Sequence, residues 1–177
     1  MAHYTSTQIR TDIVARLIVA SLVASGHVYN SRVVALEPAD LPAILVRSAG
    51  FEDANRSIAL PSLVRTETIS IQTMLQEDTE SALSAAIDAL TESILSTLFL
   101  DGSWIRRYEK IDGIKVDLGM DADADRLRGG SMISFTVRQS VEYTPVVADD
   151  LSTVHIDVDL EDDDQIEAQL TITDLEV

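Results

Sequence analysis

Three aspartates at alternating positions are the strongest candidates for metal chemistry in this sequence. Asp121, Asp123 and Asp125 have the spacing with which a helix-loop-helix calcium site begins. Such a loop also needs a glycine at its sixth position and a bidentate glutamate at its twelfth, where Arg126 and Met132 stand here. We therefore expect an acidic, solvated surface at these aspartates, with weak cation binding as the alternative, and no calcium sensor.

The other residue types that perform catalysis form no recognisable pattern. His3, His27 and His155 lie far apart in the chain, so no local His-x-x-x-His zinc pair occurs. No serine stands in a Gly-x-Ser-x-Gly elbow, no phosphate-binding glycine loop is present, and the chain contains no cysteine. We expect no catalytic residue, no cofactor and no resident metal, and we expect that the protein is not an enzyme.

One local cluster combines basic and aromatic residues: Trp104, Arg106, Arg107 and Tyr108. Aromatic rings beside arginines can stack on bases and contact phosphates. Two arginines provide few such contacts, and the whole chain has 30 acidic against 13 basic residues, a net charge of −17. We therefore predict that the cluster forms an interface with another subunit or a protein partner rather than with nucleic acid.

Charge divides the chain into two parts. Residues 141–177 hold twelve acidic residues and no lysine or arginine, so this segment carries −12 of the net charge of −17. We predict a folded body over residues 1–145 and an acidic extension over residues 146–177. The extension includes a predicted acidic turn formed by Glu161, Asp162, Asp163 and Asp164.

Length and composition fit one globular body. The chain has 177 residues, of which 46% are hydrophobic and 24% charged, so a packed core is expected. No stretch approaches about 18 uncharged apolar residues, and the N-terminus lacks the pattern of a signal peptide. These features predict a soluble, intracellular protein with no membrane partner.

Two helices and several strands are expected to build this body. Apolar residues three and four apart predict a helix over residues 7–25, capped by Ser6 or Thr7 and ended by Gly26. A second helix, capped by Asp78 or Thr79, is predicted to bury one stripe of side chains: Leu83, Ile87, Leu90, Ile94 and Leu98.

Alternating apolar and polar residues predict the strands. We expect a short extended piece around 32–36 and strands at 41–46, 63–75 and 133–143. We also expect a hairpin over 108–118 that turns at Asp112 and Gly113, and loops over 50–61 and 119–130. The strand at 133–143 is expected inside the sheet. The order of helix, strands, helix and strands predicts an α+β fold with a mainly antiparallel or mixed sheet packed by two main helices.

The acidic extension is predicted to form a β-hairpin. Its apolar residues alternate with polar ones on both sides of the acidic turn, and they are Ile156, Val158, Leu160, Ile166, Leu170 and Ile172. An isolated two-stranded hairpin is marginal in water. We therefore predict that this apolar face contacts another subunit or a partner.

From about residue 5 to residue 145, the layout resembles the phage tail terminator family, whose members are also described as minor tail or tail-completion proteins. The resemblance is carried by the helix that begins TQIR at residue 7, the segment EPADLPAILV at 37–46, the strand over 66–75 and the amphipathic helix after it. Within that segment, the DLPAI entry at 40–44 is the most characteristic piece.

This resemblance implies a structural virion protein. Members would form a homohexameric ring that caps the head-proximal end of a tail tube, stops tail polymerisation and offers the joining surface for the neck. The implied partners are further copies of the chain, the tail tube protein, the neck or head-connector protein and the tail sheath. DNA would only pass through the channel, and the protein would reach the virion tail or neck after assembly in the host cytoplasm.

Two other functions stay open at this point. An acidic mimic of DNA would space its carboxylates like phosphates, and a small enzyme would need a pocket with convergent polar groups. We rank the structural ring first, the acidic mimic or binding protein second and the enzyme third. The sequence also does not distinguish a terminator from a neighbouring neck or tail-to-head joining protein. It does not indicate whether the tail is contractile or noncontractile.

Overall fold

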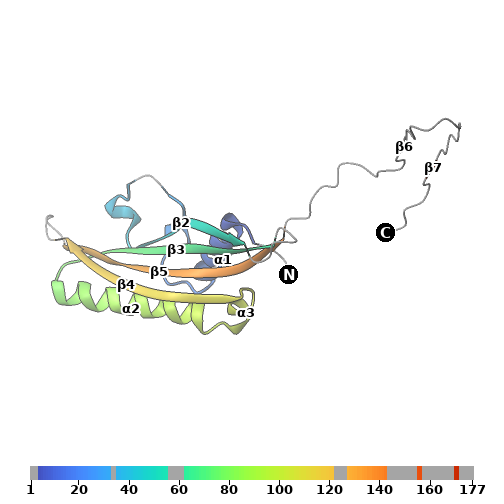
Figure 1. Cartoon of the computed structure of the whole chain (residues 1–177). Helices are drawn as coiled ribbons and strands as arrows, with labels where there is room; N and C mark the ends of the chain where they lie inside the picture. Colours follow the sequence, from blue (N-terminus) through green and yellow to red (C-terminus); the bar gives the residue numbers. More distant parts are fainter. Residues whose placement is uncertain are drawn as a thin grey trace, which may run out of the picture. The chain divides into compact units, whose positions relative to one another are not determined.

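A computed structural model describes residues 4–32, 35–55, 62–121, 127–142, 155–156 and 170–171. The chain divides into two units, Met1–Tyr143 and Thr144–Val177. The first unit, called the body below, is an α+β structure in which a sheet packs against helices (Figure 1). In the second unit, the described residues form β6 (His155–Ile156) and β7 (Leu170–Thr171), which pair antiparallel.

The body has a five-stranded mixed sheet in the order β1-β2-β3-β5-β4. Its elements along the chain are α1 (Ser6–Val19), β1 (Val28–Asn30), β2 (Ala43–Asn55), β3 (Ser62–Glu77), α2 (Glu80–Phe99), α3 (Gly102–Ile105), β4 (Lys110–Asp121) and β5 (Leu127–Glu142). β1 is parallel to β2, and the other neighbours are antiparallel. The predicted α+β class is confirmed, and β5 lies inside the sheet as expected.

α1 begins one residue before the predicted start and ends six residues before the predicted end. Thr5 caps it, because its hydroxyl accepts the Gln8 N–H while the Gln8 side chain accepts the Thr5 N–H. After Val19 the chain turns through Ser21, whose φ of 53° lies in the left-handed region and ends the helix.

α2 is the longest of the described helices, and all five residues of its predicted apolar stripe are buried. It is capped by Thr79 and packs on β3 and β5, whereas α1 packs on β1 and β2 and touches α2. By length and composition alone α2 could cross a membrane, with a mean hydropathy of 1.3, contrary to the expectation that no stretch would. Its buried stripe and exposed Asp88 and Glu92 are typical of a core helix.

The first strands lie differently from the prediction. Of the extended piece expected at 32–36, residues 33–34 lie outside the described part of the chain. The first described strand is Val28–Asn30, which pairs with Ile44–Val46 of β2. β2 begins at Ala43, two residues after the predicted start at 41, and continues to Asn55, so residues 50–55 are not a loop. The reason is pairing with β3, which continues past a register shift at Gly50, where φ is 128°.

The hairpin predicted over residues 108–118 does not form. Lys110–Asp112 and Lys115–Asp121 both pair with β5, so this segment is one continuous strand. Asp112 lies opposite Thr136 and Lys115 opposite Ser134, which leaves one extra residue on β4 and makes a β-bulge. Gly113, with φ of 65°, supplies the left-handed conformation within it.

Both ends of the loop predicted over residues 119–130 are strand. Gly119 pairs with Gly130, and β4 and β5 continue to Asp121 and from Leu127. Residues 122–126 lie outside the described part of the chain.

Candidate functional site

The aromatic members of the predicted interface cluster belong to the core of the body. Trp104 is fully buried and Tyr108 is 7% exposed. The Trp104 ring lies 5.9 Å from Phe99, 6.2 Å from Phe135 and 5.6 Å from Tyr108, in edge-to-face contacts. Burial raises the pKa of the Tyr108 hydroxyl to about 12. The prediction that these two residues contact a partner is therefore wrong, because they fill the subunit's own interior.

The arginines of the same cluster lie at the surface. Arg106 is exposed, and Arg107 Nη1 lies 3.3 Å from Asp12 Oδ2 of α1. Asp12 also pairs with Arg16 Nε at 3.2 Å, and Arg16 reaches Asp101, the residue that caps α3. Hydrogen bonds from Ser103, followed by the Arg16 contact, lower the pKa of Asp101 to about 2. These ion pairs link the start of α3 and the residues after it to α1.

The acidic candidates are only partly placed. Asp121 ends β4, where its backbone pairs with Arg128 of β5, and Asp123 and Asp125 lie outside the described residues. The described residues contain no group of three histidine, aspartate or glutamate side chains that could hold a metal ion. The predicted acidic turn also lies outside the described residues: Glu161, Asp162, Asp163 and Asp164.

Of the predicted apolar face of the extension, two positions are described. Ile156 of β6 lies opposite Leu170 of β7, and His155 lies opposite Thr171. The remaining members of that face lie outside the described residues: Val158, Leu160, Ile166 and Ile172.

A surface that the sequence prediction missed lies along β4, at one edge of the sheet. Val116, Leu118 and Met120 face the α2 side, because they pair with Ile133, Ser131 and Gly129 of β5; their exposed fractions are 38%, 58% and 50%. We call these three residues the β4 apolar row. The sequence does carry a signal for this row, because its three residues alternate with Lys115, Asp117 and Gly119. The predicted hairpin ends at residue 118 and so obscures the full strand.

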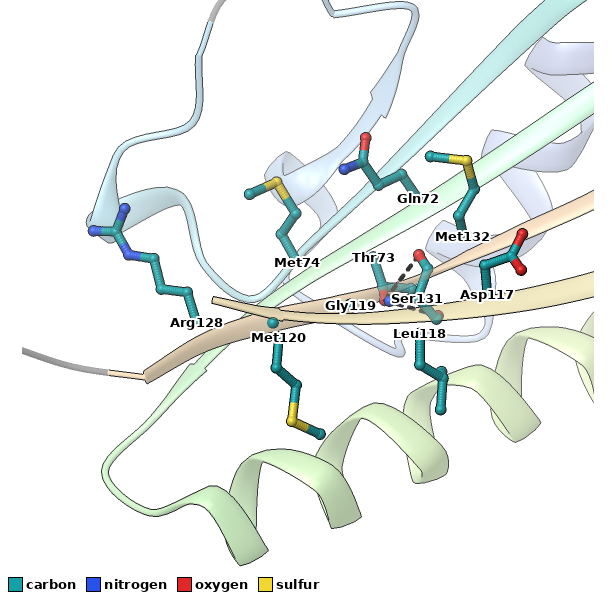
Figure 2. A pocket seen from close by; sticks show the side chains of 12 residues that line it. Gln72, Thr73, Met74, Asp117, Leu118, Gly119, Met120, Arg128, Ser131 and Met132 are labelled. Carbon is teal, nitrogen blue, oxygen red and sulfur yellow. Dashed lines mark hydrogen bonds between the residues drawn. The ribbon is translucent and has the colours of Figure 1, made fainter. Parts of the chain in front are cut away.

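The opposite face of the sheet is hollowed beside β4. A shallow hollow of about 520 Å³ lies over β3, β5 and β4, where the facing pair Gly119 and Gly130 places no side chains on this side of the sheet. Figure 2 shows Gln72, Met74 and Met132 on this side of the sheet, whereas Leu118 and Met120 point toward α2.

The hollow offers contact surface rather than convergent acid and base groups. Its two ionisable residues have local partners: Asp117 Oδ2 accepts from Lys115 Nζ at 2.7 Å, and Arg128 Nε donates to Gln76 Oε1 at 3.3 Å. Methionines such as Met132, which is 43% exposed, are flexible and adapt to the shape of a partner. The geometry around β4 therefore suits binding of a polypeptide better than chemistry on a small substrate.

No protein-family model matches this sequence, and no curated protein matches it.

Proposed function

We propose that this protein is a ring-forming structural subunit that closes the head-proximal end of a phage tail tube. The observation that carries the proposal is that the two edges of the sheet are unlike. One edge is β1, a three-residue strand held parallel, and the other is β4, a twelve-residue antiparallel strand with its exposed apolar row. When two different surfaces of identical subunits meet head to tail, the subunits form a ring if the rotation from each subunit to the next closes on itself.

The resemblance of residues 5–145 to phage tail terminators supplies the biological setting of this ring. The end of a tail tube presents a repeating surface that recruits further tube subunits. A ring that binds this surface but does not present the same surface on its outer side would stop growth of the tube. The net charge of −17 suits a channel through which DNA passes, because carboxylates repel phosphates. The proposed partners are the tail tube protein and the neck or head connector.

Solution mass tests this proposal most directly. We expect the full chain to form a closed ring, hexameric by the resemblance, in native mass spectrometry and in negative-stain images. Leu118→Lys should break the ring into smaller species, because it places a charge in the β4 apolar row. Val19→Lys, at a position 84% exposed on α1, is the matched control and should leave the ring intact. A parent protein that stays monomeric, or forms only twofold dimers, would overturn the proposal.

A further inference from the structure

The outer edge of β4 has no partner strand among the described residues. β4 pairs with β5 along one side over Lys110–Asp121, and the other side of this twelve-residue strand is the end of the sheet. A long edge strand presents a row of backbone N–H and C=O groups that can pair with another extended segment.

The side chains of β4 favour a particular kind of added strand. On the α2 side the apolar row stays partly exposed, and Met120 lines a shallow hollow with polar residues of α2 that include Ser84 and Asp88. On the opposite side stand Lys110 and Lys115, the only two lysines of the chain, which are 58% and 69% exposed. Arg138 of β5 lies opposite Lys110 and is exposed as well.

These lysines and the bulge at Gly113 are also devices that protect an edge from unselective pairing. Each lysine has a neighbouring aspartate, Asp112 for Lys110 and Asp117 for Lys115. Counted with Arg138, the three cations named here outnumber these two carboxylates. A strand with carboxylates on one face and aliphatic groups on the other therefore complements both faces of β4.

We propose that the β4 edge accepts a strand from the C-terminal unit, Thr144–Val177, of a second copy of this chain. That unit has the required alternation, with Asp157 and Asp159 between Ile156, Val158 and Leu160. It contains eleven acidic residues and no lysine or arginine, so its charge is opposite to that of the lysines on β4. The inference rests on the proposed ring, in which each subunit must donate a strand to one neighbour and accept a strand from the other.

Photo-crosslinking between isotopically distinct chains tests this inference. The unlabelled chain carries p-benzoylphenylalanine in place of Leu118, and the second chain is uniformly ¹⁵N-labelled and unmodified. The two full-length chains are mixed, dissociated mildly and reassembled together before irradiation. Mass spectrometry then identifies which peptide is attached to residue 118 and whether it is light or heavy. The same photoreactive residue in place of Val19 is the matched control.

We expect heavy peptides from residues 144–177 on the position-118 probe and none on the position-19 probe. Lys115→Glu in the probe chain should reduce the yield, as should added salt. Crosslinks to light peptides of the C-terminal unit alone would show docking within one chain and would overturn the inference, as would crosslinks that never involve this unit. Solution mass separates this result from the proposed function. If the protein forms a ring but gives no crosslink, the proposed function stands and this inference fails. If a heavy crosslink forms in a twofold dimer, this inference stands and the proposed ring fails.

Discussion

Thr91 Oγ1 of α2 donates a hydrogen bond to Ser131 Oγ of β5 at 2.8 Å, inside the body. Ser131 Oγ also shares a 2.9 Å hydrogen bond with Thr73 Oγ1 of β3, and Thr73 Oγ1 accepts the Ser131 backbone N–H at 2.7 Å. All three residues are buried. Because polar groups in an apolar core need their partners, this cluster fixes the position of α2 over the two central strands.

Ser131→Ala should lower the free energy of unfolding by about 1–3 kcal/mol, because it leaves the Thr91 hydroxyl buried without its acceptor. Urea denaturation at neutral pH measures the change. Ser96→Ala, on the exposed face of α2, is the matched control and should change stability by less than about 0.5 kcal/mol. A Ser131→Ala protein as stable as the parent would show that the cluster contributes no net stability.

Gly130→Ala and Gly119→Ala should differ sharply although the two residues face each other across β4 and β5. A Cβ on residue 130 would lie 1.9 Å from the Thr73 carbonyl oxygen, whereas a Cβ on residue 119 would meet no atom within 4 Å. Gly130→Ala should cost about 3 kcal/mol or more, since backbone atoms must shift. Gly119→Ala should be neutral or slightly stabilising. Thermal melting of both variants checks this, and equal melting temperatures would contradict the close approach of β3 and β5.

Elements with a long regular period could be predicted from the sequence. The α2 stripe, from Leu83 to Leu98, and the buried side of β5, including Ile133 and Phe135, are where the periods placed them. In these segments local preference and burial agree, so the sequence pattern alone determines which face is inside.

Features that depend on distant pairing could not be predicted. Asp112 and Gly113 have the residue types of a hairpin turn, yet β5 pairs with both flanking segments and converts the turn into a bulge. Residues 50–55 look like a loop but find partners on β3. Tertiary pairing outweighs local turn preference in both places. The same limit affected Trp104, whose aromatic neighbours include Phe135, 31 positions later in the chain.

Glu67→Leu should stabilise the body. Glu67 lies between Phe51 of β2 and Val137 of β5 and is fully buried, and neither carboxylate oxygen has a hydrogen-bond partner among the described residues. Replacing it with an apolar residue removes an uncompensated polar group and should add about 1–3 kcal/mol to the free energy of unfolding. Glu67→Gln should add less, because the amide is still unpaired.

The control for this substitution is Glu92→Gln, on the exposed face of α2, where a change within about 0.5 kcal/mol is expected. Chemical denaturation of the three variants gives the comparison. Loss of stability in Glu67→Leu would show that the carboxylate has a favourable partner in solution.

Asp101→Asn should flatten part of the acid unfolding profile. Ser103 hydrogen bonds, aided by Arg16, lower the folded-state pKa of Asp101 from 3.8 to about 2, so the charged form is favoured in the folded state. Its contribution to stability is therefore complete above pH 3.8 and is lost as pH falls through about 2. The parent should be more stable than the variant at pH 6, and the difference should shrink over this window.

Melting temperatures of parent and variant at matched pH values measure that difference. Asp40 and Asp112 also have a lowered pKa, Asp40 through the Glu37 backbone N–H and Asp112 through the Lys110 side chain, and both titrate equally in the two proteins. Asp88→Asn, exposed on α2, serves as the control. A difference that stays constant down to pH 2 would contradict the assigned pKa.

Deletion of residues 152–177 should leave the body folded but weaken the ring and its docking to tail components. The reason is that these residues belong to a unit separate from the body and carry most of the acidic excess of the chain's end. Circular dichroism, solution mass and a tail-binding assay on the same truncation separate folding, assembly and docking. Salt should affect docking more than folding, because only docking depends on exposed charges.

A full-length chain with Ile156→Ser and Leu170→Ser is the matched control for charge, because it removes an apolar pair of β6 and β7 while every carboxylate stays. If apolar contacts hold the neighbour, this variant should assemble as poorly as the truncation; if charge alone does, it should assemble like the parent. Global unfolding of the truncation would place the C-terminal unit in the subunit's own core. Unchanged assembly together with unchanged docking would show that the unit is dispensable, and the neighbour would then have to be held by the body alone.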